Sequence, residues 1–364
     1  FLLRTLFIPF VSSDVADGNL QYQASEGTLE SGIGLGLGMF PSTVTPLNQI
    51  QQPNSPASSS AIVNQGNNYA TIESIRVTGN VATLIHGDGD TITQNQWEHF
   101  DIKGWVVLPK SQVFANEKEF SDIQDTIDSI QRGQADVPYE KMMMQLDSTT
   151  GNYDDSGPQT LGHKGNTLRY RKIQNLDLCP LIMQYLRKPL YKAACQRVYG
   201  QDTPIASFRT MFFNKPPKLE TGAPGGTRLP WHQDRWKYLD RDPLLNIYLA
   251  LDAAVPETGC MKIISGSHKN GVINPDHHSA FLSDENCRSM GLDDNAALPN
   301  PLVQDFWLHP GEVALMHNWV VHCSGVNSTD VSRRALSISY MDARSQLTVE
   351  SFSKYVGGEL QTTG

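Results

Sequence analysis

Trp231-His232-Gln233-Asp234 is the stretch that decides the fold, because it places a histidine and a carboxylate two residues apart. A distant histidine, His322, completes a set of two imidazoles and one carboxylate. Such a set holds Fe(II) on one face and leaves three positions open for other ligands. Arg333 follows His322 by eleven residues and offers a guanidinium fork to a carboxylate. Together these residues indicate an iron enzyme that uses 2-oxoglutarate.

The His-x-Asp pattern alone is weak evidence, since the chain contains it three times, beginning at His86, His99 and His232. His86 lies in a Gly/Asp-rich run that is typical of a turn. His99 lies in 94–101, where we predict a short helix, followed by a strand over 104–108. The ordinary interpretation of either pair is a surface or capping contact.

The third match has a context that suits a metal site. His232 follows the Gly/Pro loop 221–227, which itself follows a strand predicted over 205–213. A β-barrel scaffold offers metal sites on loops at the mouth between its strands. His232 and Asp234 are therefore the pair that we follow.

The chain upstream of this site is predicted to be mainly helical. Asn116 and Glu119 form a candidate capping box, and Gly133 ends the helix that follows. Its apolar side chains recur at helical spacing: Phe120, Ile123, Ile127 and Ile130. Further helix is predicted over 180–198, interrupted at Pro189 and ended by Gly200. Short strands then dominate, over 205–213, 245–252, 261–264, 312–316 and 335–340, which predicts an α+β layout on a barrel or sandwich.

Six short motifs in a fixed order carry a resemblance to a known family. They are Asn214-Lys-Pro-Pro217, Trp231-His-Gln-Asp234, Thr258-Gly-Cys-Met261, Ser265-Gly-Ser-His-Lys269, Gly311-Glu-Val313 and His322-Cys-Ser-Gly-Val-Asn327. The sequence resembles the phytanoyl-CoA dioxygenase family of Fe(II)/2-oxoglutarate oxygenases from about Gln94 to Tyr340. The resemblance implies a double-stranded β-helix (a cupin-like jelly roll) with helices packed on one sheet.

The same resemblance implies roles for particular residues. The metal ligands would be His232, Asp234 and His322, and Arg333 would bind 2-oxoglutarate. Four more residues fall where relatives line the cosubstrate pocket: Lys172, Met211, Tyr248 and Ser324. Tyr248 departs from the family pattern, in which tryptophan is common. Halogenating relatives carry a small residue in place of Asp234, so the carboxylate implies hydroxylation, with Fe(II), 2-oxoglutarate and O₂ consumed or bound and succinate and CO₂ released.

Three nearby histidines compete for the distal ligand position: His309, His317 and His322. His317 and His322 are five residues apart, so on a continuous strand they would face opposite sides. The order of the family motifs selects His322. We expect His317 to be a packed or hydrogen-bonded strand residue.

Two adjacent arginines, Arg333 and Arg334, must face opposite sides of a strand. Arg333 shares its face with the small residues Ala335, Ser337 and Ser339, whereas Arg334 shares its face with Leu336, Ile338 and Tyr340. A cavity that admits a small dianion suits the small, polar face, which selects Arg333. Arg334 fits an ion-pair role better.

Composition excludes some classes of protein. The 364 residues are 39% hydrophobic with a formal charge of −9, which argues against nucleic acid or an anionic membrane as the main partner. No run of about twenty apolar residues could span a bilayer. Five scattered cysteines without C-x-x-C spacing favour a reducing compartment, the cytoplasm or an organelle lumen. The sequence sets no oligomeric state.

The chain is divided by composition into four parts. Residues 1–70 are predicted to be disordered, a linker or part of a targeting segment, since 11–70 are rich in Gly, Ser, Gln, Asn and Pro. The apolar segment 1–10 fits either the tail of a targeting peptide or a strand. Because the chain begins at Phe1, we expect it to be a fragment or a processed product. An extension over 71–91 is expected to hold a strand pair, followed by the oxygenase domain over 92–345 and a tail over 346–364.

The substrate is expected to be a small, polar metabolite. The stretches 136–166 and 269–307 are expected to shape the substrate mouth, and both are polar with charges of both signs. No long apolar run signals a fatty acyl chain. Two other classes remain open: a non-catalytic metal-binding jelly-roll protein, and a cupin-like metalloenzyme that is independent of 2-oxoglutarate.

Overall fold

The computed structural model describes residues 6–7, 92–236, 239–273, 281–292 and 300–346. The predicted linker over 11–70, the strand pair over 71–91 and residues 347–364 of the predicted tail lie outside the described residues. Within 1–10, Leu6–Phe7 (β1) is a short strand that pairs with Ser207 and Ala206 of β6.

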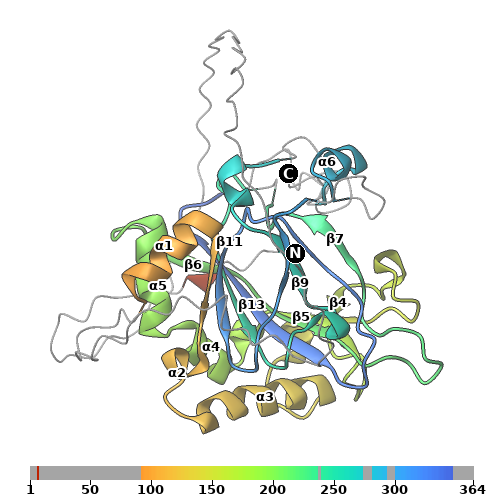
Figure 1. Cartoon of the computed structure of the whole chain (residues 1–364). Coiled ribbons are helices and arrows are strands. Elements are labelled where there is room, and N and C mark those ends of the chain that lie inside the picture. The colour runs from red at the N-terminus through yellow and green to blue at the C-terminus, as the bar shows by residue number, and fades with distance from the viewer. Residues whose placement is uncertain (1–5, 8–91, 237–238, 274–280, 293–299, 347–364) are drawn as a thin grey trace, which may run out of the picture. The chain divides into compact units, whose positions relative to one another are not determined.

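Two antiparallel sheets form the body of the structure (Figure 1). The larger has the order β2 (Trp105–Leu108), β11 (Val313–His317), β8 (Leu245–Ala250), β13 (Arg333–Asp342), β6 (Ile205–Lys215), β5 (Tyr170–Gln174), β3 (Met143–Leu146) and β4 (Thr160–Leu161), with β1 beside β6. The smaller has the order β10 (Val303–Phe306), β9 (Met261–Ile264), β12 (His322–Ser324) and β7 (Leu229–His232). The predicted jelly roll is confirmed.

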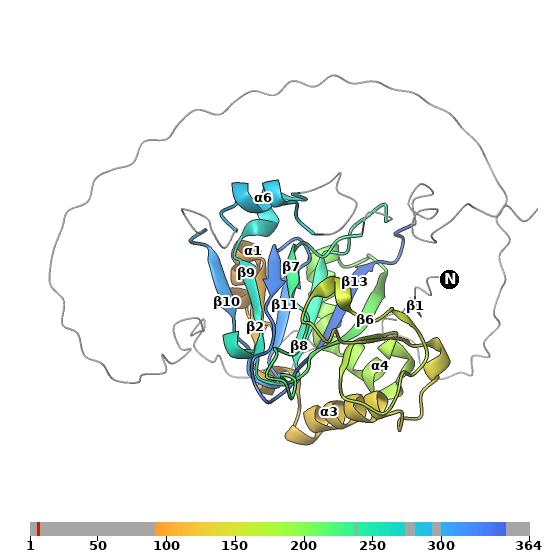
Figure 2. The same ribbon diagram turned by 90° about the vertical axis from the view of Figure 1, so that its right-hand side faces the viewer.

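Four helices lie where the sequence predicted them, and they pack against one face of the larger sheet (Figure 2). They are α1 (Gln94–Lys103), α3 (Glu117–Arg132), α4 (Pro180–Leu186) and α5 (Pro189–Tyr199). Two short helices, α2 (Lys110–Val113) and α6 (Asp284–Ser289), were not predicted. The predicted interruption at Pro189 separates α4 from α5, and Gly200 caps α5. Proline opens both helices because its missing N–H is not needed in the first turn.

Helix α3 begins with half of the predicted capping box. The Asn116 side chain accepts from the Glu119 N–H at 3.0 Å, as predicted. The Glu119 carboxylate, however, accepts from the Ala115 N–H at 2.9 Å instead of from Asn116, and it also pairs with Lys188 of the α4–α5 turn. Gly133 ends the helix in the left-handed region at φ 72°.

The two faces of the larger sheet have different functions. In β8, Ile247 and Leu249 pack in the core beneath the helices, whereas Tyr248 and Ala250 face the smaller sheet. The same alternation in β13 sends Leu336 toward the helices, as expected for side chains on a pleated strand. Large apolar side chains therefore anchor the helices, and the opposite face keeps room for a cavity.

Among the described helices, none is both long enough and apolar enough to cross a membrane. The cysteines are free thiols, and three of them are buried.

We predict that truncating Ile127 destabilises the protein far more than truncating Ile102. Ile127 is fully buried in α3, whereas Ile102 of α1 is 56% exposed. Ile127→Ala should lower the free energy of unfolding by about 2–5 kcal/mol, because it removes apolar contacts and leaves a cavity. Ile102→Ala should change it by roughly 0.5 kcal/mol or less. Urea denaturation of the full chain measures both, and equal losses would contradict the packing described for α3.

Candidate functional site

Two histidines from β7 and β12 face each other across the smaller sheet. His232 and His322 are directly opposite partners in the antiparallel pairing, and their ring centroids lie 4.1 Å apart. Asp234 follows β7, with its carboxylate 3.7 Å from His232 Nε2 and 4.0 Å from His322 Nε2. One ligand atom from each lies within 4.8 Å of the others, the sole such group of three found among the described residues.

Backbone carbonyls orient both imidazoles. His232 Nδ1 lies 2.8 Å from the Pro230 carbonyl, and His322 Nδ1 lies 2.9 Å from the Val320 carbonyl. Each Nδ1–H donates to its carbonyl, so each Nε2 turns its lone pair toward the centre. Burial, together with the nearby His322, lowers the pKa of His232 to about 4. The His232 ring is therefore suited to bind a metal as a neutral imidazole, and His322 directs its Nε2 to the same centre.

The carboxylate and its neighbours are fixed from both sides of the cavity. The Asp234 N–H donates to the Asn318 carbonyl at 2.8 Å, and Asn246 Nδ2 donates to the carboxylate at 3.4 Å. Between the two candidate ligands, Gln233 points the other way, and its Nε2 donates to the carbonyls of Gly271 and Trp319. Two imidazoles and one carboxylate form a donor set that suits Fe(II).

The other candidate histidines lie outside this group. His317 ends β11, accepts from the Trp319 N–H at 3.1 Å and packs 5.2 Å from the His268 ring. It borders the cavity, but it belongs to a different strand from His322, so the face argument for a continuous strand does not apply. His309 is exposed and contacts Glu312. His86 lies outside the described residues.

His99, which belongs to the second His-x-Asp pair, lies in α1 and packs on Trp105 of β2. Its ring lies edge-on to Trp105 at 4.6 Å, and Asp101 pairs with Arg197. This pair therefore has the structural role that the sequence context indicated.

Arg333 and Arg334 point in opposite directions, as the strand alternation predicted. Arg333 is 5% exposed and donates to the Tyr248 hydroxyl at 2.5 Å and to the Gly259 carbonyl at 2.9 Å. Gly259 has φ 73°, and a Cβ there would meet the Val326 carbonyl at 2.5 Å, so the close approach of this backbone requires glycine. Arg334 instead makes a bidentate pair with Asp252, both distances being 2.8 Å, and a further ion pair with Asp128.

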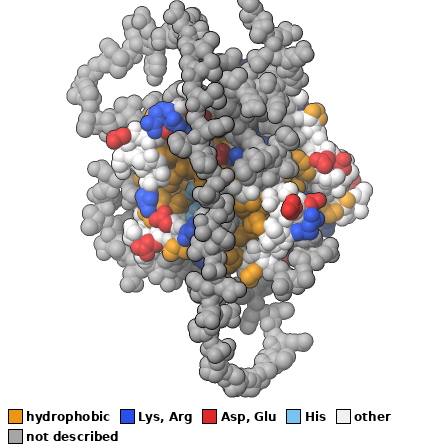
Figure 3. All heavy atoms as spheres, turned by 90° about the horizontal axis from the view of Figure 1, so that it is seen from above, with side chains coloured by type: hydrophobic (Ala, Val, Ile, Leu, Met, Phe, Trp, Pro, Cys, Tyr) orange, Lys and Arg blue, Asp and Glu red, His pale blue; other side chains and the backbone are white. Residues whose placement is uncertain are grey.

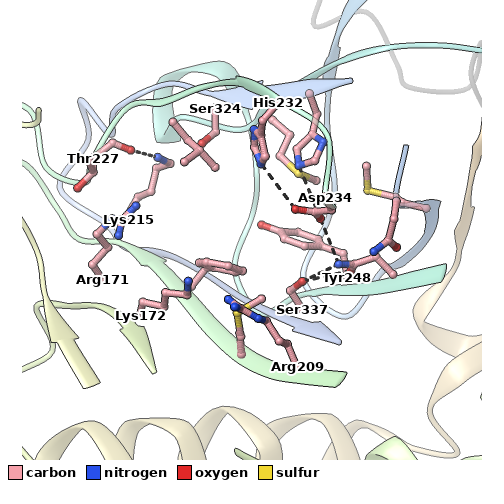
Figure 4. A pocket seen from close by; sticks show the side chains of 18 of the residues that line it. Arg171, Lys172, Arg209, Lys215, Thr227, His232, Asp234, Tyr248, Ser324 and Ser337 are labelled. Carbon is pink, nitrogen blue, oxygen red and sulfur yellow. Dashed lines mark hydrogen bonds and ion pairs between the residues drawn. The ribbon is translucent and has the colours of Figure 1, made fainter. Parts of the chain in front are cut away.

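A cavity of about 350 Å³ joins these groups (Figure 4). It is lined by the three candidate ligands, by Arg333 and by the four residues expected at the cosubstrate, namely Lys172, Met211, Tyr248 and Ser324. Burial raises the pKa of Tyr248, although Arg333 opposes the shift. Seen from above, hydrophobic side chains and a histidine lie near the centre of the face, with charged side chains around them (Figure 3).

Comparison with known proteins identifies the family. The family model for phytanoyl-CoA dioxygenase matches residues 100–335, which is more than half of the chain. The chain belongs to the phytanoyl-CoA dioxygenase family. The resemblance seen in the sequence is thereby confirmed.

Individual relatives are distant. A probable phytanoyl-CoA dioxygenase of Caenorhabditis elegans is 27% identical over 176 residues, which are 46% of this chain and 53% of that protein. A probable alpha-ketoglutarate-dependent hypophosphite dioxygenase of Stutzerimonas stutzeri is 25% identical over 254 residues, which are 69% of this chain and 78% of that protein. The chain spans about half the length of several curated relatives that it matches.

A solved structure supports the fold. The alpha-ketoglutarate-dependent carbocyclase SnoK from nogalamycin biosynthesis superposes with a TM-score of 0.53 at 15% identity, covering 74% of this chain and 92% of that one. At this identity the likeness concerns the architecture alone.

Sequence reasoning missed several residues of this phytanoyl-CoA dioxygenase family site. Lys215 lies in the wall of the cavity, donates to the Thr227 carbonyl and has Arg333 as its main charged neighbour. Burial and Arg333 lower its pKa well below the usual range. Its position in β6, in alternation with Met211, was the available signal. Asn246 and Asn318 carried no such signal.

Asn318 is the most unusual of these residues. Its side chain is 2% exposed and borders the cavity, yet neither its amide nitrogen nor its amide oxygen has a hydrogen-bond partner among the described residues. A buried amide without partners costs about 1–3 kcal/mol. Asn318 therefore places an unsatisfied polar group at the cavity wall.

We predict that replacing His322 weakens metal binding far more than replacing His317. His322→Ala should weaken Zn(II) binding by about 100-fold or more, because losing a ligand exceeds the usual effect of losing an outer contact, roughly 10–100-fold. His317→Ala should weaken it by less than about tenfold, since its ring is outside the donor set. Competition with a chelator measures both affinities, and a larger effect at His317 would refute the proposed ligand set.

We predict that Asn318→Leu leaves the metal-free protein as stable as the wild type or more stable. Leucine removes the unpartnered amide at similar volume, a gain of about 1 kcal/mol. The matched change Asn327→Leu should lower the free energy of unfolding by about 2 kcal/mol or more, because Asn327 donates to the Lys215 and Val331 carbonyls. Denaturant unfolding without ligands compares them, and similar losses in both variants would contradict the account of Asn318.

Proposed function

We propose that this chain is an Fe(II)- and 2-oxoglutarate-dependent dioxygenase that hydroxylates a C–H bond of a small, polar metabolite. The observation that carries the proposal is the convergence of His232, Asp234 and His322 in a cavity that also contains Arg333. The family supports the same reaction class. The ligand roles of the three residues are part of the proposal.

Iron, 2-oxoglutarate and O₂, when bound, supply the oxidative decarboxylation that yields succinate and CO₂ and places the other oxygen atom in the substrate C–H bond. The chain's own hydrogen bonds hold the donor atoms for this ion in position. Both Nε2 lone pairs already face the centre, and Asn246 restrains the carboxylate of Asp234.

Arg333 is proposed to bind the distal carboxylate of 2-oxoglutarate. Its Nε is buried without an acceptor in the described part of the chain, although its two terminal nitrogens contact Tyr248 and Gly259. A guanidinium binds a carboxylate through parallel hydrogen bonds, so the cosubstrate would complete its donors. Ser324 and Met211 line the same cavity, and both are at least nine-tenths buried.

The two stretches expected to shape the substrate mouth meet above the metal site. Tyr153 from 136–166 and Phe281 from 269–307 both border the cavity, and their rings touch edge to face at 5.2 Å. Phe281 also lies 5.8 Å from the His232 ring. These contacts support a role for both stretches in substrate selection.

Succinate formation tests the proposal directly. Enzyme loaded with Fe(II) under anaerobic conditions and then exposed to O₂ should convert 2-oxoglutarate to succinate, with further stimulation by the right metabolite. Metabolite extracts should then show a mass gain of one oxygen atom. Metal binding without succinate under any condition would favour a non-catalytic protein. Metal-dependent turnover that ignores 2-oxoglutarate would favour a cupin-like enzyme.

We predict that Arg333→Gln raises the KM for 2-oxoglutarate by about 10–100-fold, which corresponds to the loss of one hydrogen bond between charged groups. The adjacent Arg334→Gln should lower thermal stability because it breaks the pair with Asp252, but it should leave this KM unchanged. Succinate assays below the melting temperature of both variants give the comparison. An unchanged KM for Arg333→Gln would refute the cosubstrate assignment.

A further inference from the structure

The side-chain amide of Asn318 is a polar group of the cavity wall whose partner the protein itself does not supply. The side chain is buried, and neither amide atom finds a hydrogen-bond partner within the ranges that the structure describes. A primary amide offers two N–H donors and a carbonyl acceptor. Because native proteins pair nearly all buried polar groups, this amide calls for a ligand that both donates and accepts.

The backbone of Asn318 is held on both sides. Its N–H donates to the Leu244 carbonyl at 3.1 Å, and its carbonyl accepts from the Asp234 N–H at 2.8 Å. The residue therefore stands directly after β11 and beside a candidate metal ligand. A side chain on so restrained a backbone loses little further freedom when it binds a ligand, which suits a recognition role.

Strand register places Asn318 away from the proposed cosubstrate site. Tyr248 is paired with Ala314 of β11 on one side and with Ser337 of β13 on the other. Both of these strands are antiparallel to β8, so they run in the same direction. Asn318 comes after Ala314 along that direction, whereas Arg333 comes before Ser337. The two side chains therefore belong to opposite ends of the cavity.

Figure 4 shows the same division of the cavity. Lys215, which is paired with Arg333 in the sheet, lies with Thr227 on one side, and Asp234 lies on the other. A five-carbon diacid that reaches from Arg333 to the candidate ligands occupies the first half. The other half is bordered by residues 316–318, and it is the half in which a substrate would meet the metal centre.

The complement of a side-chain amide is a planar edge that carries an acceptor next to an N–H. Asparagine binds such an edge through two parallel hydrogen bonds, as it does with adenine in DNA. Carboxamides, lactams and ureas present this edge. A carboxylate has acceptors alone and would leave the amide oxygen of Asn318 unpaired. A hydroxyl has a single oxygen, which cannot align well with both amide atoms at once.

We propose that Asn318 is a substrate-specificity residue that binds the amide edge of a carboxamide, lactam or urea group in the primary substrate. This inference rests on the proposed function and narrows its polar metabolite to that chemical class. Two parallel hydrogen bonds beside Asp234 fix the orientation of the substrate, and so they select which C–H bond faces the metal centre.

Three small probes of matched shape test the recognition of an amide edge. The full chain is loaded with Zn(II) and saturating 2-oxoglutarate, so that the cosubstrate site is filled and no turnover occurs. Ligand-observed NMR titrations then compare propanamide, butanone and 2-butanol. Propanamide should bind about tenfold more tightly than either of the others, because the ketone leaves the buried amide oxygen of Asn318 unpaired and the alcohol aligns poorly.

Variants separate a binding contact from a structural role. Asn318→Leu should reverse the preference, so that butanone binds more tightly than propanamide, whose N–H is then buried without an acceptor. Asn318→Ser keeps a donor and an acceptor and should retain part of the preference for propanamide. A structural role would instead change all three affinities alike. Gln124→Leu is the control, because the Gln124 amide donates to the Leu251 carbonyl and does not line the cavity.

The native substrate gives a second test. The metabolite that gains one oxygen atom in extracts should contain a carboxamide, lactam or urea group. Asn318→Leu should raise the KM for this metabolite by about 10–100-fold, the loss expected when two hydrogen bonds are removed, and should lower kcat by less. The Gln124→Leu control should keep the KM of the wild type.

Three results overturn the inference. Propanamide and butanone bind the wild type equally, as expected if water alone partners the amide. The preference for propanamide persists in Asn318→Leu, as expected if the metal holds the carbonyl. The oxidised metabolite lacks an amide edge. In each case 2-oxoglutarate still binds with Arg333 dependence, and the proposed function stands. Failure of 2-oxoglutarate to bind the Zn(II)-loaded wild type would instead refute the proposed function and the inference that rests on it.

Discussion

The antiparallel pairing of β7 with β12 is the interaction on which the site depends. It sets His232 opposite His322, and the next inward-facing residue, Asp234, brings its carboxylate to both rings. The backbone carbonyl two residues before each histidine accepts a hydrogen bond from its Nδ1 and so orients the ring. The side-chain amide of Gln233, which lies between the candidate ligands, donates to carbonyls of two loops. The geometry is thus held by backbone contacts, which change little when a cavity side chain is replaced.

The larger sheet supplies the opposite wall and separates stability from chemistry. Its outer face buries large apolar side chains such as Leu249 and Leu336 beneath the helices. Its inner face carries Asn246, Ser337 and Arg333, which are polar, buried and directed into the cavity. Because adjacent residues alternate between these faces, a shift of one residue in β13 would exchange Arg333 with Arg334 and destroy both functions. Pairing of β13 with both β6 and β8 prevents that shift.

Local patterns predicted an α+β layout on a barrel or sandwich, and the family resemblance implied the jelly roll and the proposed ligands. Strand alternation distinguished Arg333 from Arg334, and the predicted strand over 261–264 coincides with β9. What the sequence could not show depends on contacts between distant segments. Nothing local to Asn318 indicates that its amide lacks a partner, and nothing local to Lys172 indicates that Arg209 is its neighbour. The second half of the capping box was wrong for the same reason, since Glu119 also contacts Lys188.

The placement of the two histidines on separate strands has a consequence for the protein's lifetime. An ion bound by both would cross-link β7, a short edge strand of the four-stranded sheet, to β12, its inner neighbour. Ligands that bind the folded state alone stabilise it by an amount that rises with the logarithm of their free concentration above Kd, so a chain deprived of iron would open this edge more often. Proteases act on such openings. Iron supply would then govern how much of the protein persists in the cell as well as how fast it works.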